Sequence, residues 1–555
     1  MSTLKDRLHR VLVIGATPAG LAATNKLGEM GIPVTLIDPD PDLNEKLARE
    51  EWRFSSGQLM NYALRPGLLR ILRNPRIHCI LPGEITSLKH TPQGFCARYR
   101  SAPTYVDPEA CTLCGQCVEV CPVTLTDGSK PIRFYGRQSL PGRPIIDKRR
   151  KPLCQTNCPL GVNVQGYMAL AGAGRYSEAL ELIRRDNVLP GICGRVCTHP
   201  CEVACRRSEI DRPLAIRDIK RFLADREGAQ PTPSTPKAPS TVRKERLAVI
   251  GSGPSGLAAA ADLARLGYSV TVFEREKETG GLLRYGIGPH RLPREVLDRE
   301  IDYIERLGVR FVTSHAVDLS NGLTDLRNEY KGIIVCTGMW MDRKLGVPGE
   351  DLEGVSGCIE TLTKFYRGEI ADFGRNVAVI GDGNAAFDLA RCLVRTGGKA
   401  TILSWFPEEL IPAAASEIAD ARAEGVSIST STQVAAFSGR KGRLQSLRCV
   451  PTQPGEPDDK GIPWPVPQPG AEPFDLEFDR AIVAIGQVGR EDTFGNAIRV
   501  HRNGAIQVDE LCATSLPHVH AAGDAAAGPS TIVQAMASGR RAALALHRRL
   551  TGESP

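Results

Sequence analysis

Ten cysteines between positions 111 and 205 are the residues of this sequence best suited to redox chemistry. The first four, Cys111, Cys114, Cys117 and Cys121, follow the pattern C-x2-C-x2-C-x3-C-P. Thiolates at this spacing bind the corners of a 4Fe–4S cubane. Zinc sites rarely need three thiolates this close together and a Cys-Pro pair. We therefore expect an iron–sulfur cluster at this motif.

Six further cysteines follow at four-residue spacing, in two groups: Cys154 and Cys158, then Cys193, Cys197, Cys201 and Cys205. A four-residue repeat can place side chains on one face of a helix, but Gly194 and Pro200 favour short helical turns and loops around clusters. Ten thiolates are enough for two 4Fe–4S clusters with two to spare, or for three clusters with some non-cysteine ligands. A zinc or structural role for the downstream groups stays open.

A glycine-rich loop after a predicted buried strand indicates a dinucleotide site. Gly251 permits the tight turn, Gly253 lets the backbone approach a pyrophosphate, and Gly256 lets the following helix pack closely on the strand. The next predicted strand ends at Glu274, whose carboxylate can accept a ribose hydroxyl. Strand, loop, helix and acid together make dinucleotide binding the favoured interpretation.

A second loop of this kind contains Gly381 and Gly383, followed by Asn384 and Ala385 at the start of a predicted helix. It also follows an apolar strand, so we expect it to bind a nucleotide. Two dinucleotide sites in one chain imply that one cofactor passes electrons to the other.

A segment near the C-terminus indicates that the first of these sites binds a flavin. Gly523 and Asp524 end a predicted strand, where the carboxylate can accept a ribityl hydroxyl. The helix expected from about Ile532 has an N-terminal dipole that favours the negative charge of a reduced flavin. We therefore expect FAD to bind between these two distant segments.

A third loop, near the N-terminus, lacks the middle glycine. Thr17 stands between Gly15 and Gly20, and its Cβ would crowd a phosphate. No later motif completes a flavin domain around this loop. We expect a Rossmann-like lobe without a nucleotide.

These motifs predict an α/β protein with two doubly wound dinucleotide-binding domains, for FAD and NAD(P), an N-terminal Rossmann-like lobe and a mainly helical iron–sulfur domain. A Pro/Ser/Thr-rich stretch near 229–240 marks a linker. The expected boundaries are 1–105 for the N-terminal lobe, 106–225 for the iron–sulfur domain, 226–244 for the linker, 245–375 and 475–555 for the two parts of the FAD domain, and 376–474 for the NAD(P)H domain.

Length and composition agree with this organisation. A chain of 555 residues is too long for one core, and a net charge of +7 gives no indication of nucleic acid or membrane binding. No apolar run is long enough for a signal peptide or a membrane span, so we expect a cytoplasmic protein. The cytoplasm keeps thiols reduced, which favours metal ligation over disulfides for the cysteine block.

The order of the motifs resembles the small (beta) subunit of glutamate synthase and its relatives over about residues 151–550. The residues that carry this resemblance are Cys154-x3-Cys158-Pro-Leu-Gly, Gly191-Ile-Cys-Gly-Arg-Val-Cys197, Gly251-Ser-Gly-Pro-Ser-Gly256, Gly280-Gly-Leu-Leu-Arg-Tyr-Gly-Ile287, Arg291-Leu-Pro293, Gly381-Asp-Gly-Asn-Ala and Gly523-Asp524. About residues 10–125 resemble the N-terminal part of the flavoprotein subunit of heterodisulfide reductase, through Val11-Leu-Val-Ile-Gly15 and Tyr105-Val-Asp-Pro-Glu-Ala-Cys111.

The resemblance implies FAD between the Gly251 and Gly523 segments and NAD(P)H at Gly381, and it adds Gly281, Leu283, Arg291 and Ile532 to the expected FAD contacts. The sequence departs from the family in three ways. Two cysteines that precede the equivalent of Cys154 are missing, and Cys111, Cys114 and Cys117 are candidate substitutes. A non-cysteine ligand of some members falls near Lys220, which cannot play that role. The Tyr-Arg-Arg of NADPH-specific members is replaced by Ser404-Trp405-Phe406, followed by Glu408 and Glu409, which favours NADH.

The predicted function is electron exchange between a nicotinamide nucleotide and a ferredoxin or a partner catalytic subunit, such as a 2-oxoacid:ferredoxin oxidoreductase, in a hetero-oligomeric complex. The alternatives are a stand-alone NAD(P)H:ferredoxin reductase, a glutamate synthase small subunit, and a nucleotide-binding redox sensor. The nucleotide domains contain no Cys-x-x-Cys pair, which argues against a disulfide reductase. The hydride chemistry is then carried by the cofactors, and no side chain is predicted to be catalytic.

Overall fold

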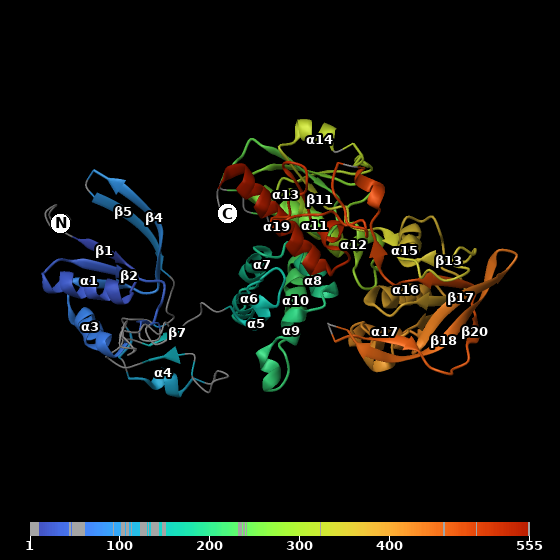
Figure 1. The fold of residues 1–555 in the computed structure, drawn as a ribbon, viewed down its shortest axis with the longest axis horizontal. Coiled ribbons are helices and arrows are strands. Elements are labelled where there is room, and N and C mark those ends of the chain that lie inside the picture. The colour runs from blue at the N-terminus through green and yellow to red at the C-terminus, as the bar shows by residue number, and fades with distance from the viewer. Residues whose placement is uncertain are drawn as a thin grey trace. The chain divides into compact units, whose positions relative to one another are not determined.

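The chain divides into two compact units, Met1–Lys151 and Pro152–Pro555, each with its own hydrophobic core (Figure 1). The division falls inside the segment 106–225 that the sequence predicts as one iron–sulfur domain. The structure, a computed structural model, describes residues 10–43, 46, 61–92, 94–101, 106, 110–112, 114–121, 130, 132–134, 144–146, 151–230, 236, 239, 241–321, 323–458, 461–495 and 497–552.

The first unit is built on a parallel sheet in the order β1-β2-β3, which agrees with the predicted Rossmann-like lobe. Leu21, Leu36, Leu68 and Ile71 form its core. Its elements are β1 (Val11–Ile14), α1 (Pro18–Glu29), β2 (Val34–Ile37), α3 (Asn61–Arg73), β3 (Ile77–Ile80), the hairpin of β4 (Gly83–Thr91) and β5 (Gly94–Ser101), α4 (Gln116–Glu119), and the pair β6 (Ile132–Arg133) and β7 (Ile145–Ile146).

The second unit contains a five-stranded parallel sheet in the order β10-β9-β8-β11-β23. Strand β23 comes from the end of the chain and pairs with β11, so this module is assembled from two distant segments, as predicted. Its elements are β8 (Arg246–Ile250), α11 (Pro254–Arg265), β9 (Ser269–Phe273), α12 (Leu282–Tyr285), α13 (Arg294–Arg306), β10 (Arg310–Val312), α14 (Thr324–Glu329), β11 (Gly332–Val335), β23 (Val519–Ala521), α18 (Asp524–Ala527) and α19 (Ile532–Thr551).

A second five-stranded parallel sheet has the order β13-β21-β14-β15-β16 and is extended by an antiparallel sheet. Strands β13 and β21 lie outside the predicted range 376–474, so the module is larger than the sequence indicates. Its elements are β13 (Val355–Gly357), α15 (Cys358–Tyr366), β14 (Asn376–Ile380), α16 (Asn384–Arg395), β15 (Lys399–Leu403), η4 (Glu408–Leu410), α17 (Ala415–Ala423), β16 (Ser427–Ser429), β17 (Thr432–Arg440), β18 (Arg443–Pro457), β19 (Pro463–Pro467), β20 (Phe474–Glu477) and β21 (Arg480–Val483).

The chain crosses between the two modules twice, and the two crossings pair as the antiparallel strands β12 (Met341–Asp342) and β22 (Gln487–Val488). The turn η5 (Glu491–Phe494) follows the second crossing. The two sheets are therefore joined by one short ribbon.

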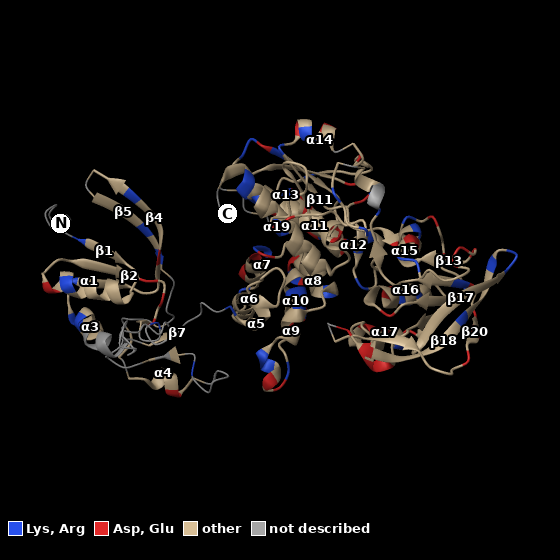
Figure 2. Ribbon diagram, viewed as in Figure 1, with Lys and Arg blue, Asp and Glu red and all other residues tan. Residues whose placement is uncertain are grey.

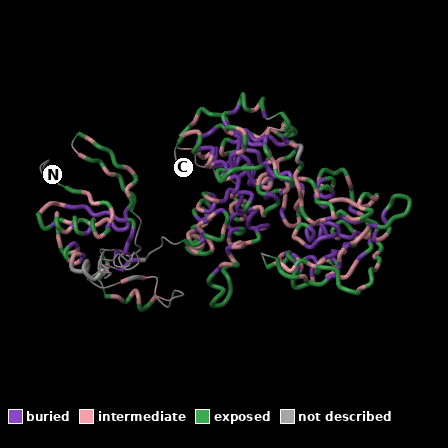
Figure 3. Tube along the Cα trace, in the orientation of Figure 1, coloured by how far each residue is buried: buried purple, intermediate pink, exposed green. Residues whose placement is uncertain are grey.

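Short helices precede the first module and share its core (Figure 3). Ile192 and Leu223 belong to the same buried cluster as Leu257 and Val296 of that module. The helical stretch predicted around 164–185 is two helices, because Gly174 adopts a φ of +74° between them. The helices are α5 (Leu153–Thr156), α6 (Val164–Gly172), α7 (Tyr176–Arg184), α8 (Pro190–Val196), α9 (Pro200–Val203), η3 (Arg206–Glu209) and α10 (Ile216–Gly228).

Basic and acidic residues are both spread over the elements of each unit (Figure 2). None of the helices in the described part of the chain has the length and apolar character needed to span a bilayer.

Candidate functional site

A cavity of about 460 Å³ lies at the ends of the strands of the first parallel sheet and is lined by residues from both of its segments. Seven of the ten residues predicted to bind FAD line it: Gly251, Gly253, Glu274, Gly281, Leu283, Asp524 and Ile532. The split module thus brings the predicted residues of its two halves to one place.

The glycines of the first loop have separate steric roles. A Cβ on Gly251 would lie 2.4 Å from the carbonyl oxygen of Cys336, and one on Gly256 would lie 1.9 Å from that of Gly251. A Cβ on Gly253 would meet no atom within 4 Å, so this position faces open space at the cavity. Gly523, which does not line the cavity, has a φ of +67° and packs against Ser255.

Glu274 is buried and held by the loop that it faces. Its carboxylate accepts hydrogen bonds from the backbone N–H and the hydroxyl of Ser252, at 3.0 and 2.5 Å, and from the N–H of Glu276 at 2.9 Å. A carboxylate has about four acceptor positions, so one remains for a ribose hydroxyl.

Asp524 lines the same cavity from the C-terminal segment. The hydroxyl of Ser530 donates to its carboxylate at 2.6 Å, and burial raises the pKa of Asp524. The first turn of α19 also lines the cavity at Thr531 and Ile532, and Thr531 caps this helix with Gln534. The cavity thus brings together the carboxylates of Glu274 and Asp524, the N-terminus of α19 and the open position at Gly253. This combination of groups fits FAD.

The structure does not bring Arg291 to this cavity. Its guanidinium forms ion pairs with Asp388 of α16 and, at 3.0 Å, with Glu417 of α17. It therefore joins the first module to the second. Burial raises the pKa of Asp388 to about 6.

The second loop has the same backbone form as the first. Gly381 has a φ of +124°, and its Cβ would lie 2.4 Å from the carbonyl oxygen of Ala484. A Cβ on Gly383 would meet nothing within 4 Å, and Gly383 caps α16. The side chain of Asn384 accepts the N–H of Ala414 at 3.0 Å, and the carbonyl of Ala385 faces the thiol of Cys358. The open Gly383 at a helix N-terminus fits a nucleotide pyrophosphate.

Sequence reasoning missed a polar pair beside this loop. The buried hydroxyl of Ser404, at the end of β15, donates to the carboxylate of Asp382 at 2.7 Å and accepts the N–H of Phe406 at 3.1 Å. Here the acid is on the loop and the hydroxyl follows the strand, the reverse of Glu274 and Ser252. The acid within Gly381-Asp382-Gly383 was the feature of the sequence that could have indicated this pair.

An aromatic cluster lies just after β15, at the two positions on which the expected preference for NADH rests. Trp405 lies 5.9 Å from Trp464 of β19 between ring centroids, and Phe406 lies 6.0 Å from Trp464. Trp405 is half-buried, and Glu408 pairs with Arg422 at 2.8 Å. No guanidinium is present at these two positions to bind a phosphate.

The six downstream cysteines lie on or beside the short helices, and several of their thiols are neighbours. Burial raises the pKa of Cys201 to about 11, and the nearby thiols of Cys158 and Cys197 contribute to this rise. Burial also raises the pKa of Cys154, with Cys205 as its next contributor. Cys193 is fully buried beside Cys197, and its pKa rises to about 12, chiefly through burial.

Within the described ranges, no three His, Cys, Asp or Glu side chains gather as the ligands of one metal ion would. A cubane instead distributes its thiolates over four iron atoms. In the first unit, Cys117 lies on α4 and Cys111, Cys114 and Cys121 flank it, and Gly115 precedes this helix with a φ of +81°. Hydrogen bonding, first from the N–H of Gln116, lowers the pKa of the exposed Cys114 thiol.

One contact joins the cysteine helices to the flavin cavity. The thiol of Cys193 donates to the sulfur of Met536 at 3.7 Å, and Met536 is fully buried on α19 beside Ala535, which lines the cavity. Glu300 of α13 accepts the N–H groups of Gly191 and Ile192 at 2.6 and 3.1 Å and so holds α8 in place.

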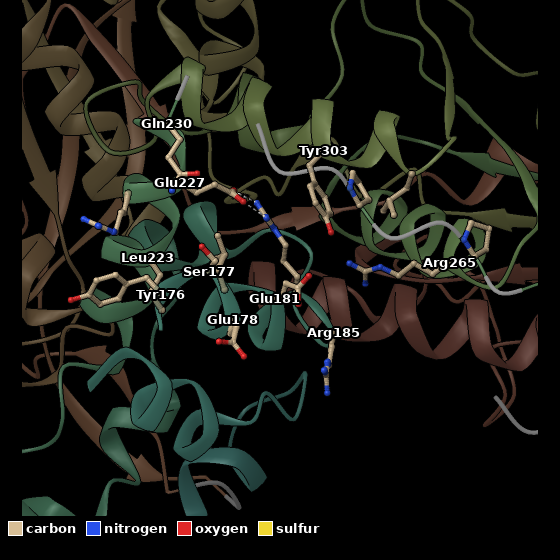
Figure 4. A pocket seen from close by; sticks show the side chains of 16 residues that line it. Tyr176, Ser177, Glu178, Glu181, Arg185, Leu223, Glu227, Gln230, Arg265 and Tyr303 are labelled. Atoms are coloured by element: carbon tan, nitrogen blue, oxygen red, sulfur yellow. Dashed lines mark hydrogen bonds and ion pairs between the residues drawn. The ribbon is translucent and has the colours of Figure 1, made fainter. Parts of the chain in front are cut away.

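A larger cavity, of about 720 Å³, is lined by residues of α7, α10 and α13 and contains none of the predicted site residues (Figure 4). Two of its charged groups pair with each other: Arg184 pairs with Glu227 at 2.5 Å, and it stacks 4.1 Å from the ring centre of Tyr303.

In the first unit, the carboxylate of Asp38, which follows β2, is bound by other groups of the protein. Asp38 accepts the N–H of Ala16 at 2.7 Å and pairs with Lys46 at 2.6 Å, and both side chains are buried.

Comparisons with known proteins follow the same division of the chain. Residues 245–539 match the family "pyridine nucleotide-disulphide oxidoreductase", residues 148–232 match "dihydropyrimidine dehydrogenase domain II, 4Fe-4S cluster", and residues 104–123 match "4Fe-4S binding domain".

Three curated relatives share much of the chain. The beta subunit of NADP(+)-dependent formate dehydrogenase from Moorella thermoacetica is 38% identical over 72% of this chain and 60% of its own length. The beta subunit of NADPH-Fe(3+) oxidoreductase from Geobacter sulfurreducens is 32% identical over 73% of this chain and 64% of its own. The small chain of glutamate synthase [NADPH] from Mycobacterium tuberculosis is 32% identical over 73% and 86%. The chain thus spans less than two thirds of the first two relatives.

Proposed function

Because this chain belongs to the pyridine nucleotide-disulphide oxidoreductase family, in the branch of the glutamate synthase small chain, we propose that it passes electrons from NADH through FAD to 4Fe–4S clusters and on to a ferredoxin or a partner catalytic subunit. The family and its domains establish an FAD-dependent NAD(P)H oxidoreductase with 4Fe–4S clusters, as expected from the sequence. The direction, the final acceptor and the roles of single residues are the proposed parts.

The observation that carries this proposal is the 3.7 Å contact between Cys193 and Met536. It links the helices that hold the cysteines to the helix that lines the FAD cavity, without an intervening solvent layer. When bound, FAD supplies the conversion between a two-electron hydride donor and one-electron carriers. The protein excludes water from the path, since Cys193 is 1% exposed and Met536 is 0% exposed.

The residues divide the binding tasks as follows. Gly253 leaves room for the FAD pyrophosphate, Glu274 accepts from a ribose, and Asp524 accepts from the ribityl chain. Gly381 and Gly383 form the nucleotide loop. The remaining assignments are Gly251, Gly256, Gly281, Leu283, Gly523 and Ile532 to the FAD module and Asn384 and Ala385 to the NAD(P)H module; Arg291 is assigned to the contact between modules.

For the clusters, we assign Cys158, Cys197 and Cys201 to one site, because their thiols are neighbours. Cys193 is assigned to the same site, because its thiol is a neighbour of Cys197. Cys154 and Cys205 belong to a second site. The motif from Cys111 to Cys121 forms a further site. The paired Asp38 and Lys46 support a first lobe without a nucleotide.

The aromatic pair at 405 and 406 supports NADH as the donor. Each missing charge-assisted contact to a 2′-phosphate is worth about 1.5–3 kcal/mol. The double variant Trp405→Arg/Phe406→Arg should therefore lower the KM for NADPH by tenfold or more, with Trp464→Phe as a control that leaves the charge unchanged. If wild type already prefers NADPH in steady-state kinetics, the NADH assignment is wrong.

The partner is proposed because two of the relatives are named as beta subunits and one as a small chain. A 2-oxoacid:ferredoxin oxidoreductase is the favoured class, and a stand-alone NAD(P)H:ferredoxin reductase is the second candidate. Affinity purification of the native protein decides between them: co-elution of larger subunits supports the first, and a lone flavoprotein that reduces ferredoxin supports the second. A lone protein with FAD and iron that reduces no acceptor would contradict both.

A further inference from the structure

Lys220 of α10 is a buried lysine in the cysteine region. Its exposed fraction is 6%, and no Asp or Glu of the described residues lies within ion-pair distance of it. Burying an ammonium without a counter-charge is costly, so buried lysines in proteins are ordinarily paired. The charge that balances Lys220 therefore has to come from another group.

Lys220 lies on the buried face of α10 together with Ile216 and Leu223, and these two residues share one buried cluster with Cys193, Cys197 and Cys201. Helix α10 packs against α8 and α9, and Gly194 makes the approach possible, since a Cβ there would lie 2.7 Å from the Cα of Arg221. Burial raises the pKa values of Cys193, Cys197 and Cys201. The positive charge of Lys220 has the next largest effect on these three pKa values, and it lowers each of them.

We propose that the Lys220 ammonium balances the negative charge of the cluster held by Cys158, Cys197 and Cys201, and thereby raises its reduction potential. An ammonium has three N–H donors and no lone pair, so Lys220 cannot ligate iron, but it favours the state with one more electron. No bond forms and no proton moves in this step. The inference rests on the proposed function, because it requires a cluster at these cysteines.

Three variants of the full-length protein separate charge from volume. Lys220→Met keeps the length and apolar stem of the side chain and removes its charge, and Lys220→Arg keeps the charge. Arg221→Met removes the next charge on the same helix, where the Arg221 side chain is 55% exposed and water screens it. The readout is an anaerobic redox titration of the cluster signals by electron paramagnetic resonance, with iron, sulfide and FAD determined for each variant.

We expect Lys220→Met to decrease the reduced-to-oxidised ratio of one cluster by about tenfold or more at a fixed potential, which is a shift of about 59 mV for one electron. Lys220→Arg and Arg221→Met should titrate like wild type. If Lys220→Met instead loses the iron of one cluster and keeps its FAD, while Lys220→Arg keeps both, the charge is again the cause and the proposal holds.

Three results would overturn the inference: unchanged titrations in Lys220→Met, equal shifts or equal iron loss in Lys220→Met and Lys220→Arg, or an equal shift in Arg221→Met. These outcomes leave the proposed function intact, because wild type still contains its clusters. Wild type without iron and sulfide after anaerobic purification would refute the proposed function itself, and this inference with it.

Discussion

Among single residues, the glycines of the first loop show how a short motif combines two requirements. Gly256 is needed for packing, since any Cβ would overlap the carbonyl of Gly251. Gly253 has an ordinary φ of −68° and no neighbour in its Cβ direction, so only a ligand can require glycine there.

We therefore predict opposite defects for two conservative variants. Gly253→Ala should keep its secondary structure and its unfolding midpoint without cofactor, but lose FAD affinity by tenfold or more. Gly256→Ala should lose about 1–3 kcal/mol of stability through overpacking. Equilibrium dialysis of FAD and urea unfolding measure the two effects. Normal FAD binding by Gly253→Ala would show that the pyrophosphate does not approach this position.

A buried histidine gives a prediction on pH. His520 of β23 is 1% exposed, and burial lowers its pKa from 6.5 to about 4. In the unfolded chain His520 binds a proton below about pH 6.5, whereas in the folded chain it does so only below about pH 4. The free energy of unfolding therefore falls as the pH decreases through this window, by up to about 3 kcal/mol.

The variant His520→Gln should show a shallower decline in urea-unfolding free energy between pH 6.5 and pH 4 than wild type. The exposed His501→Gln serves as the control and should follow wild type. Parallel curves for wild type and His520→Gln would mean that His520 does not titrate in this range.

Residue-level sequence reasoning succeeded where a local motif fixes the backbone and failed where the partner is distant. The first glycine loop, Glu274 and Asp524 line one cavity, because strand, turn and helix are encoded within a few residues. The Asp382–Ser404 hydrogen bond and the ion pairs of Arg291 were not predicted, because Ser404, Asp388 and Glu417 approach these residues only in the folded chain.

At the scale of elements, α19 connects the cofactor sites. Its first turn lines the FAD cavity, Met536 meets Cys193, and Arg540 reaches the end of α7. The Arg540 guanidinium donates to the carbonyl of Asp186 at 2.8 Å and pairs with Asp262 at 2.8 Å. This helix therefore determines how the cysteine helices sit on the flavin module.

We predict that Arg540→Met destabilises the second unit by about 2–4 kcal/mol, because it leaves buried Asp262 with one weaker partner, Arg265, at 3.3 Å. Electron transfer from flavin to cluster should slow in the same variant. The neighbouring Arg541 is exposed, so Arg541→Met is the matched control in urea unfolding and stopped-flow spectroscopy. Equal stability of the two variants would contradict this role for Arg540.

Elements also mark the limit of sequence-based boundaries. Strands β13 and β21 contain three and four residues, and their places in the second sheet follow from pairing with distant strands rather than from local pattern. The helical stretch near 164–185 had the expected apolar periodicity, but Gly174 divides it.

At the scale of the whole molecule, the predicted fold class and cofactor set are confirmed by the family matches. The sequence could not predict that the downstream cysteine helices share one core with the flavin module, because that core is formed by residues far apart in the chain. This shared core makes a direct path from flavin to cluster physically possible.

The central claim is that electrons pass from NADH through FAD to the clusters within one polypeptide. Anaerobic rapid mixing with NADH, followed by optical detection of flavin and freeze-quenched electron paramagnetic resonance, tests it most directly. We predict that the flavin absorbance bleaches first and that cluster signals then appear in the same protein without an added mediator. Bleached flavin with silent clusters, or no bleaching with either NADH or NADPH, would contradict the account.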